Sequence, residues 1–251
     1  MKDTRSFAQK VESGQVSALL FDLDGVLTPT TDLHKLAWSN LFTPFLEARG
    51  SAPYTEDDYY AYVDGKSRID GVASLLASRG IDLPAGGPTQ AEDTGPTIWG
   101  MAQDKNANFA SVLQAEGIDP YPGSAAFLEY AARLGVPMAV VSSSKNAREV
   151  LKLSGLAGYF PVVVDGEYAA EAGLPGKPSP DTYLRAAELV GSEPGSAVVF
   201  EDALSGVAAG RAGNFTIVVG VDRGAGVEEL QGAGATMVVS DLSDLIPEGA
   251  A

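Results

Sequence analysis

The sequence predicts an α/β protein with a doubly wound parallel sheet and an all-helical insert. From residue 122 onward, short apolar runs alternate with stretches of helical spacing, a pattern typical of parallel strands joined by right-handed helical crossovers. Between residues 32 and 121, apolar residues recur at helical spacing and no convincing strand interrupts them. We therefore expect a sheet-containing core at 1–31 and 122–251 and a helical insert at 32–121.

The individual elements follow from the same patterns. The polar residues 1–17 are expected to form a short helix that leads into a strand at 18–21, an apolar run too short for a helix. The Gly-, Pro- and Thr-rich stretch 82–97 predicts an exposed loop. Further strands are expected at 138–141, 162–164, 197–200, 216–219 and 237–239. Helices are expected at about 33–42, 55–63, 69–79, 97–116, 124–134, 147–154, 180–190 and 203–212.

Composition excludes several classes of function. The chain of 251 residues has no cysteine, which rules out disulfide and thiolate chemistry, and it has no run of 18 apolar residues that would span a membrane. Its net charge of −16 argues against nucleic-acid binding. The first residues lack the apolar segment of a signal peptide, so the cytoplasm is the expected compartment. We expect a monomer.

Two acids after the first strand are the main candidates for chemistry. Asp22 and Asp24 alternate along the chain, so their side chains point to the same side where the strand ends. Their mutual repulsion calls for a cation, and oxygen ligands suit Mg²⁺. An acidic turn is the alternative at this point. A calcium loop is excluded because its twelfth position, which requires Glu, is Leu33.

Three further groups of polar residues follow later segments of the core. Ser142 comes directly after an apolar strand and either binds an anionic oxygen or caps a helix. Lys177 lies in a proline-stiffened loop, where it contacts a phosphoryl group, shields carboxylates or is simply solvated. Glu201 and Asp202 follow another strand, where they either complete a metal site or complement a helix dipole.

Together these motifs resemble the haloacid-dehalogenase-like superfamily, whose members transfer phosphoryl groups through an aspartate nucleophile. The resemblance rests on D-x-D-G, Ser, K-P-x-P and E-D in this order, and it covers residues 16–245. It implies a Rossmann-like core and identifies the helical insert as a small α-helical cap. The second Asp of the first motif is similar to that of the phosphotransferase branch rather than to the dehalogenases.

The resemblance also implies a role for each motif residue. Asp22 would be the nucleophile that forms an aspartyl-phosphate, and Asp24 would be the general acid and base. The other roles implied are binding of Mg²⁺ by Asp22, Asp24, Glu201 and Asp202, and binding of the transferring phosphoryl oxygens by Ser142 and Lys177.

The residues after the motif serine, 142–146, and the segment 63–68 are similar to the β-phosphoglucomutase branch of this superfamily. In that branch the residues after the motif serine hold a sugar phosphate, and a cap arginine binds the phosphate that is not being transferred. His34, the only histidine, matches a residue near the hinge of the cap, although a polar residue on the first cap helix is the alternative. The residues implied to bind substrate are Gly65, Arg68, Lys105, Ser143, Ser144, Lys145 and Asn146, in addition to His34.

The expected function is therefore that of a phosphosugar mutase. It would interconvert β-glucose 1-phosphate and glucose 6-phosphate through a sugar bisphosphate. A small-molecule phosphatase with the same nucleophile is the main alternative, and a non-catalytic phosphosugar- or Mg²⁺-binding module is a third. Pro29, Lys66 and the long 82–97 loop depart from the mutase pattern and leave the exact sugar open.

Overall fold

The chain divides into two compact units in the computed structural model, which describes residues 2–88 and 95–250. The first unit ends at Pro29 and resumes at Ile118, and the second spans Thr30–Gly117. In the described part of the chain, every helix is too short or too polar to cross a membrane.

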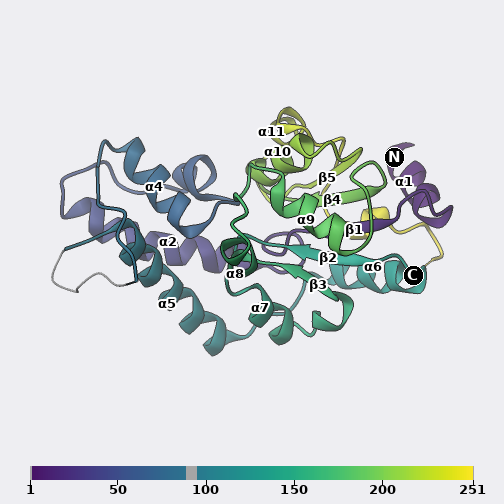
Figure 1. Ribbon diagram of the computed structural model, residues 1–251, viewed down its shortest axis with the longest axis horizontal. Helices are drawn as coiled ribbons and strands as arrows, with labels where there is room; N and C mark the ends of the chain where they lie inside the picture. The colour runs from purple at the N-terminus through teal and green to yellow at the C-terminus, as the bar shows by residue number, and fades with distance from the viewer. Residues whose placement is uncertain (1, 89–94, 251) are drawn as a thin grey trace. The chain divides into compact units, whose positions relative to one another are not determined.

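The first unit is built on a parallel sheet. Among the described residues the sheet has six strands in the order β3-β2-β1-β4-β5-β6 (Figure 1), which confirms the predicted doubly wound fold. Strand β1 lies inside the sheet and pairs with a strand on each side. Its Phe21 is in register with Val140 of β2 and with Phe200 of β4. The strands are β1 (Ala18–Phe21), β2 (Met138–Val141), β3 (Val162–Val164), β4 (Ala197–Glu201), β5 (Ile217–Val221) and β6 (Met237–Val239).

Helices cover both faces of the sheet, and alternation along the strands sends side chains to each. On one face Leu20 and Val199 pack with Tyr183 and Val207. On the other face Phe21 stacks on Phe200, with 4.5 Å between the ring centroids. The helical segments of this unit are α1 (Lys2–Glu12), α6 (Pro122–Arg133), α7 (Ala147–Leu153), η3 (Ala157–Tyr159), α8 (Gly166–Glu171), α9 (Asp181–Leu189), α10 (Leu204–Ala212), α11 (Val227–Ala233) and η4 (Leu242–Leu245).

The second unit is helical throughout its regular structure in the described residues. Its buried residues include Trp38, Phe42 and Leu75, which belong to a single apolar cluster. Ser67 and Thr97 cap two of the helices by accepting hydrogen bonds from backbone N–H groups. The segments are α2 (Thr30–Glu47), α3 (Glu56–Asp58), the π-helical turn η1 (Tyr59–Val63), α4 (Arg68–Ser78) and α5 (Ile98–Glu116).

Some local features differ from the sequence-based expectation. The helices α8 and α11 and the 3₁₀ segments η3 and η4 were not predicted, because the helical period is easily missed in segments this short. The expected helix at 55–63 divides into α3 and η1. Residues 82–88 and 95–97 of the predicted loop have no helix or strand, and residues 89–94 lie outside the described residues.

Candidate active site

The ends of three neighbouring strands bring the predicted core residues together. Asp22 follows β1, Ser142 follows β2, and Glu201 is the last residue of β4. Because β1 pairs with both β2 and β4, these ends are adjacent at the carboxyl edge of the sheet, where ligands bind in such folds. The backbone N–H of Asp22 extends the pairing by donating to the carbonyl of Phe200 at 2.9 Å.

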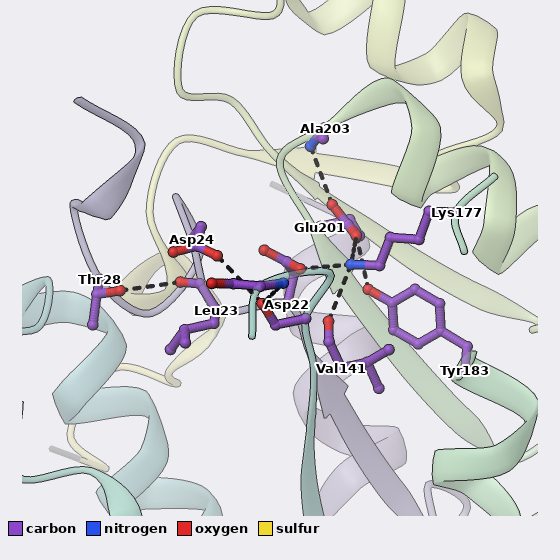
Figure 2. Close-up of polar contacts among 11 residues, drawn as sticks. Asp22, Leu23, Asp24, Thr28, Val141, Lys177, Tyr183, Glu201 and Ala203 are labelled. Atoms are coloured by element: carbon purple, nitrogen blue, oxygen red, sulfur yellow. Dashed lines mark hydrogen bonds and ion pairs between the residues drawn. The ribbon is translucent and has the colours of Figure 1, made fainter. Parts of the chain in front are cut away.

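Lys177 joins the strand ends through its ammonium group. Its Nζ donates to Asp22 Oδ1 at 2.5 Å, to Glu201 Oε1 at 2.5 Å and to the carbonyl of Val141 at 3.0 Å (Figure 2). The residue is only 3% exposed. A buried ammonium is costly unless it is paired and fully hydrogen-bonded, and these contacts meet that condition.

Glu201 is held by more than the lysine. Its Oε1 also accepts from the hydroxyl of Tyr183 at 2.9 Å, and its Oε2 accepts from the backbone N–H of Ala203 at 3.2 Å (Figure 2). A Cβ atom at Gly206 would lie 1.7 Å from Glu201 Oε1, so only glycine leaves room for this carboxylate. Tyr183 was not predicted as a site residue, because a tyrosine on the apolar side of a helix looks like any core tyrosine.

The electrostatics of this cluster show an excess of negative charge. Burial raises the pKa of Asp22 well above its usual range, and the nearby carboxylates of Glu201 and Asp24 raise it further, against the opposing effect of Lys177. Burial would lower the pKa of Lys177, but the Asp22 and Glu201 carboxylates outweigh it and hold that pKa above the ordinary value. Burial and the same carboxylates also raise the pKa of Tyr183. One ammonium therefore faces several acids.

Three buried carboxylates of the cluster can hold a metal ion. Asp22, Glu201 and Asp202 each offer one oxygen, and these oxygens lie within 4.8 Å of one another. Hard divalent cations prefer such oxygen ligands, and a cation here would offset the excess negative charge. The residues therefore fit a divalent cation on both donor type and charge.

Asp24 lies in a tight loop directly after Asp22. Gly25 in this loop has a φ of +84°, which a side chain would disfavour, and its N–H donates to the carbonyl of Thr28 at 2.8 Å. The side chain of Asp24 accepts a hydrogen bond from Ser142 Oγ at 3.3 Å, so the β1 and β2 ends are linked directly (Figure 2 shows the Asp24 end of this contact).

The loop after β2 carries the remaining predicted residues of the core. Ser142 is buried, Ser143, Ser144 and Asn146 are half-buried, and Lys145 is exposed. Ser142 Oγ accepts from the N–H of Ser144 at 3.0 Å, and Ser144 Oγ accepts from the N–H of Asn146 at 3.1 Å. These local bonds make the loop compact, so its polar groups stay next to the carboxyl end of β2.

Within the second unit, the structure brings two predicted substrate residues into contact. Lys105 on α5 is 2% exposed, and its Nζ contacts His34 Nδ1 on α2. The ammonium also lies 5.1 Å from the Trp38 ring and 4.9 Å from the Phe109 ring. This lysine is therefore held in a defined position by an imidazole and two aromatic rings.

Arg68 lies at the start of α4, three residues after Gly65, whose φ is +69°. Its guanidinium donates to the carbonyl of Ala102 on α5 at 3.4 Å, one helical turn before Lys105. Lys66, between Gly65 and Arg68, turns back along α4 and donates to Ser74 Oγ at 2.9 Å. Arg68 thus contacts the same helix that carries Lys105.

Comparison with known proteins identifies the class. The family model for haloacid dehalogenase-like hydrolases matches residues 16–214, and the chain belongs to this family. It is an enzyme of the phosphotransferase type found in that family.

Particular relatives are more specific. The chain is 46% identical over 244 residues to a β-phosphoglucomutase of Mycobacterium bovis, with 92% of each protein covered. It is 32% identical to hexitol phosphatase A of Escherichia coli, which covers 79% of this chain and 80% of that protein. A crystal structure of β-phosphoglucomutase from Clostridium difficile is similar with a TM-score of 0.74 and 25% identity, covering 92% of this chain and 93% of that one.

Proposed function

We propose that the protein is a Mg²⁺-dependent phosphosugar mutase that interconverts β-glucose 1-phosphate and glucose 6-phosphate through β-glucose 1,6-bisphosphate. The observation that carries the proposal is the buried network of Asp22, Lys177 and Glu201 at the carboxyl edge of the sheet. This network supports phosphoryl transfer. The 46% identity to a β-phosphoglucomutase over 92% of both chains supports the sugar and the isomerisation.

In the proposed reaction, Asp22 attacks one phosphorus atom of the bisphosphate, and an aspartyl-phosphate forms as that sugar O–P bond breaks and a sugar monophosphate is released. Asp24 gives its proton to the departing sugar oxygen. In the second half, the Asp24 carboxylate takes the proton of the free hydroxyl of a sugar monophosphate as that oxygen attacks the phosphorus, so that the bisphosphate re-forms and Asp22 is released. Ser142 and Lys177 donate hydrogen bonds to the transferring phosphoryl oxygens. Their positions beside Asp24 and Asp22 support these roles.

The proposed metal ligands are the carboxylates of Asp22 and Asp202 and the backbone carbonyl of Asp24. Mg²⁺, when bound there, neutralises charge on the transferring phosphoryl group. Glu201 is part of the same acidic cluster, but its oxygens already accept bonds from Lys177 and two other donors. We infer that Glu201 contributes mainly by fixing Lys177, and only secondarily as a ligand.

A mutase must also hold the phosphate that is not being transferred. We assign residues 32–121 the role of a helical cap whose Arg68 and Lys105 bind that distal phosphate, with Gly65 allowing close approach and His34 orienting Lys105. A guanidinium suits a phosphate that is held but not cleaved. On the core, Ser143, Ser144, Lys145 and Asn146 would bind the sugar phosphate.

A phosphatase is the second candidate function, and the 32% identity to a hexitol phosphatase favours it specifically. The two activities differ in their products. We expect the protein, given Mg²⁺, β-glucose 1-phosphate and a trace of the bisphosphate, to form glucose 6-phosphate without net release of inorganic phosphate. Stoichiometric inorganic phosphate without glucose 6-phosphate would instead establish the phosphatase.

A variant of the cap separates the two functions again. Arg68→Ala should slow isomerisation roughly 30- to 160-fold, because a charge-assisted hydrogen bond to phosphate contributes about 2–3 kcal/mol, while hydrolysis of acetyl phosphate continues. Arg49→Ala is the matched control, since Arg49 is an exposed arginine of the same unit whose guanidinium lies over the Phe45 ring. Equal isomerisation by Arg68→Ala and the wild type would remove the distal-phosphate role.

A further inference from the structure

Three successive carbonyls of the loop that carries Asp24 are each held from outside the loop. The carbonyl of Gly25 accepts from Arg223 Nε at 2.9 Å. The next carbonyl, of Val26, accepts from Ser124 Oγ at 2.7 Å, and that of Leu27 accepts from the N–H of Tyr121 at 3.0 Å. The donors come from the chain after β5 and from the start of α6, so distant parts of the sequence fix this loop.

Arg223 is itself fixed on several sides. Its Nη1 donates to the carbonyl of Ser240 at 3.1 Å, and its Nη2 is paired with Asp241 Oδ2 at 3.4 Å. The guanidinium carbon lies 3.8 Å from the centroid of the Tyr121 ring. With its side chain only 19% exposed, the planar group has one orientation, and the position of Nε is set independently of Gly25.

The partner of this arginine is also fixed. Asp241 Oδ1 accepts from the N–H of Ser243 at 2.9 Å, while its other oxygen faces Arg223. A Cβ at Gly123 would lie 1.6 Å from Asp241 Oδ1, so the start of α6 makes room for this carboxylate by having no side chain there. The arginine, its carboxylate and the glycine therefore form one preorganised support.

Of the three carbonyls, that of Gly25 is nearest in the chain to Asp24, so the hydrogen bond from Arg223 has the most direct effect on the position of Asp24. Gly25 directly follows Asp24 and has a φ of +84°, so its own backbone resists rotation less than that of any other residue type. This carbonyl belongs to the peptide group between Gly25 and Val26, which is joined to the Asp24–Gly25 peptide group only through the Gly25 Cα. A shift of the Gly25 Cα therefore displaces Asp24 and draws its carboxyl group away from Ser142 Oγ. A displacement of about 1 Å at a reacting group can lower turnover roughly 100-fold.

We propose that Arg223 is a positioning residue for Asp24, which holds the Gly25 carbonyl so that the Asp24 carboxyl meets the sugar oxygen that leaves or attacks. This inference rests on the proposed function, in which Asp24 is the acid and base. Arg223 touches neither the substrate nor the phosphorus atom. Its role is to keep the proton donor in place when the O–P bond to an alcohol breaks.

The experiment compares two phosphoryl donors with Arg223→Gln. A sugar phosphate needs a proton on its leaving oxygen, whereas acetyl phosphate releases a stable anion without one. We expect the turnover number with β-glucose 1-phosphate to fall roughly 30- to 100-fold with little change in KM, and phosphorylation of Asp22 by acetyl phosphate to fall no more than about threefold. Arg223→Lys should recover part of the loss.

Two controls distinguish positioning from damage to the fold. Arg185→Gln removes a half-buried arginine whose partners are Tyr168 and Glu188, and it should behave as the wild type with both donors. If Arg223→Gln fails to fold, Ser124→Ala tests the same loop by removing the bond to the Val26 carbonyl, with a smaller loss that shows the same donor selectivity.

The variant Asp24→Ala shows whether a negative result concerns Arg223 or the proposed acid/base role of Asp24. Asp24→Ala should also lose more activity with β-glucose 1-phosphate than with acetyl phosphate, and by a larger factor than Arg223→Gln. The double variant Asp24→Ala/Arg223→Gln should be no less active than Asp24→Ala alone. Equal loss with both donors, or no loss with either, overturns the role of Arg223. If Asp24→Ala does not discriminate between the donors, the acid/base role of Asp24 fails, and the inference fails with it.

Discussion

Two buried clusters of charge in this protein differ in their balance. In the second unit, Arg79 Nη2 pairs with Asp58 Oδ2 at 2.6 Å, and Asp58 also accepts from the N–H of Thr55 at 2.9 Å. One cation there meets one anion. In the first unit, Lys177 faces both Asp22 and Glu201, with further acids beside them.

The difference separates a pair that stabilises the fold from a group that we propose performs chemistry. Asp58 completes a capping box at the start of α3, so its carboxylate is satisfied within the chain. The cluster around Lys177 keeps a surplus of negative charge, which is costly in a buried place unless a cationic ligand offsets it. Uncompensated buried charge of this kind is a physical sign of a binding or catalytic site.

The largest effect expected from this comparison is that of Asp22→Asn. The variant should lose at least roughly 10⁴-fold in turnover, because the proposed nucleophile is gone. The metal-free variant should nevertheless melt at a higher temperature than the metal-free wild type, since one buried carboxylate is removed from the crowded cluster. Intact-mass detection of the phosphoenzyme and thermal melting check the two parts, and a lower melting temperature would contradict the charge argument.

Asp58→Asn should show the reverse behaviour, with activity retained and stability lost. Removing one partner of a buried ion pair should lower the stability of this unit by roughly 2–4 kcal/mol. Both tryptophans of the chain, Trp38 and Trp99, lie in this unit, so their fluorescence during urea unfolding reports its stability. Asp57→Asn, at the exposed neighbouring position, is the matched control and should change little.

The pH dependence of Asp58→Asn sharpens the same test. Burial would raise the pKa of Asp58, but hydrogen bonds from Arg79 and Thr55 outweigh it and lower the pKa below the ordinary value of 3.8. A lowered pKa in the folded state means that the stabilisation is fully present above pH 3.8 and is lost as the pH falls through the folded value. The variant and the wild type should therefore converge in stability in strong acid, and a constant difference would contradict this.

Mg²⁺ should affect the two clusters differently. Binding at the carboxylates of the first unit should raise the stability of the wild type by roughly 1–3 kcal/mol at saturating metal. The melting temperature with Mg²⁺ and with chelator measures this effect. Asp202→Asn should abolish the response, whereas Asp58→Asn should retain it. A response that survives Asp202→Asn would place the metal elsewhere.

Tyr183→Phe should have the smallest effect. It removes one hydrogen bond to Glu201 Oε1 and keeps the packing of the ring, so we expect a loss of about 1 kcal/mol in stability. Because Lys177 still holds Glu201, turnover should fall only a few-fold. Urea unfolding and turnover should be measured on the same sample. A loss of turnover as large as that of Asp22→Asn would show that the Tyr183 hydroxyl participates directly.

Local sequence signals identified the main elements and the polar residues after the strands. The apolar run 18–21 with Asp22 and Asp24 behind it is such a signal, because alternation and burial act over neighbouring residues. Tyr183 and Arg223 have no local signal. Arg223 reaches Gly25 across 198 positions of the chain, so its role exists only once the sheet has formed. Short helices such as α8 were missed for lack of periodicity.

The strand order has a consequence for biosynthesis. The ribosome delivers β1 well before β4, so one of the two hydrogen-bonded edges of β1 must wait for β4, which ends at residue 201. Until then a nascent chain exposes an apolar strand edge, a known hazard for aggregation. Folding of this enzyme during translation should therefore depend on protection of that edge until β4 has left the exit tunnel.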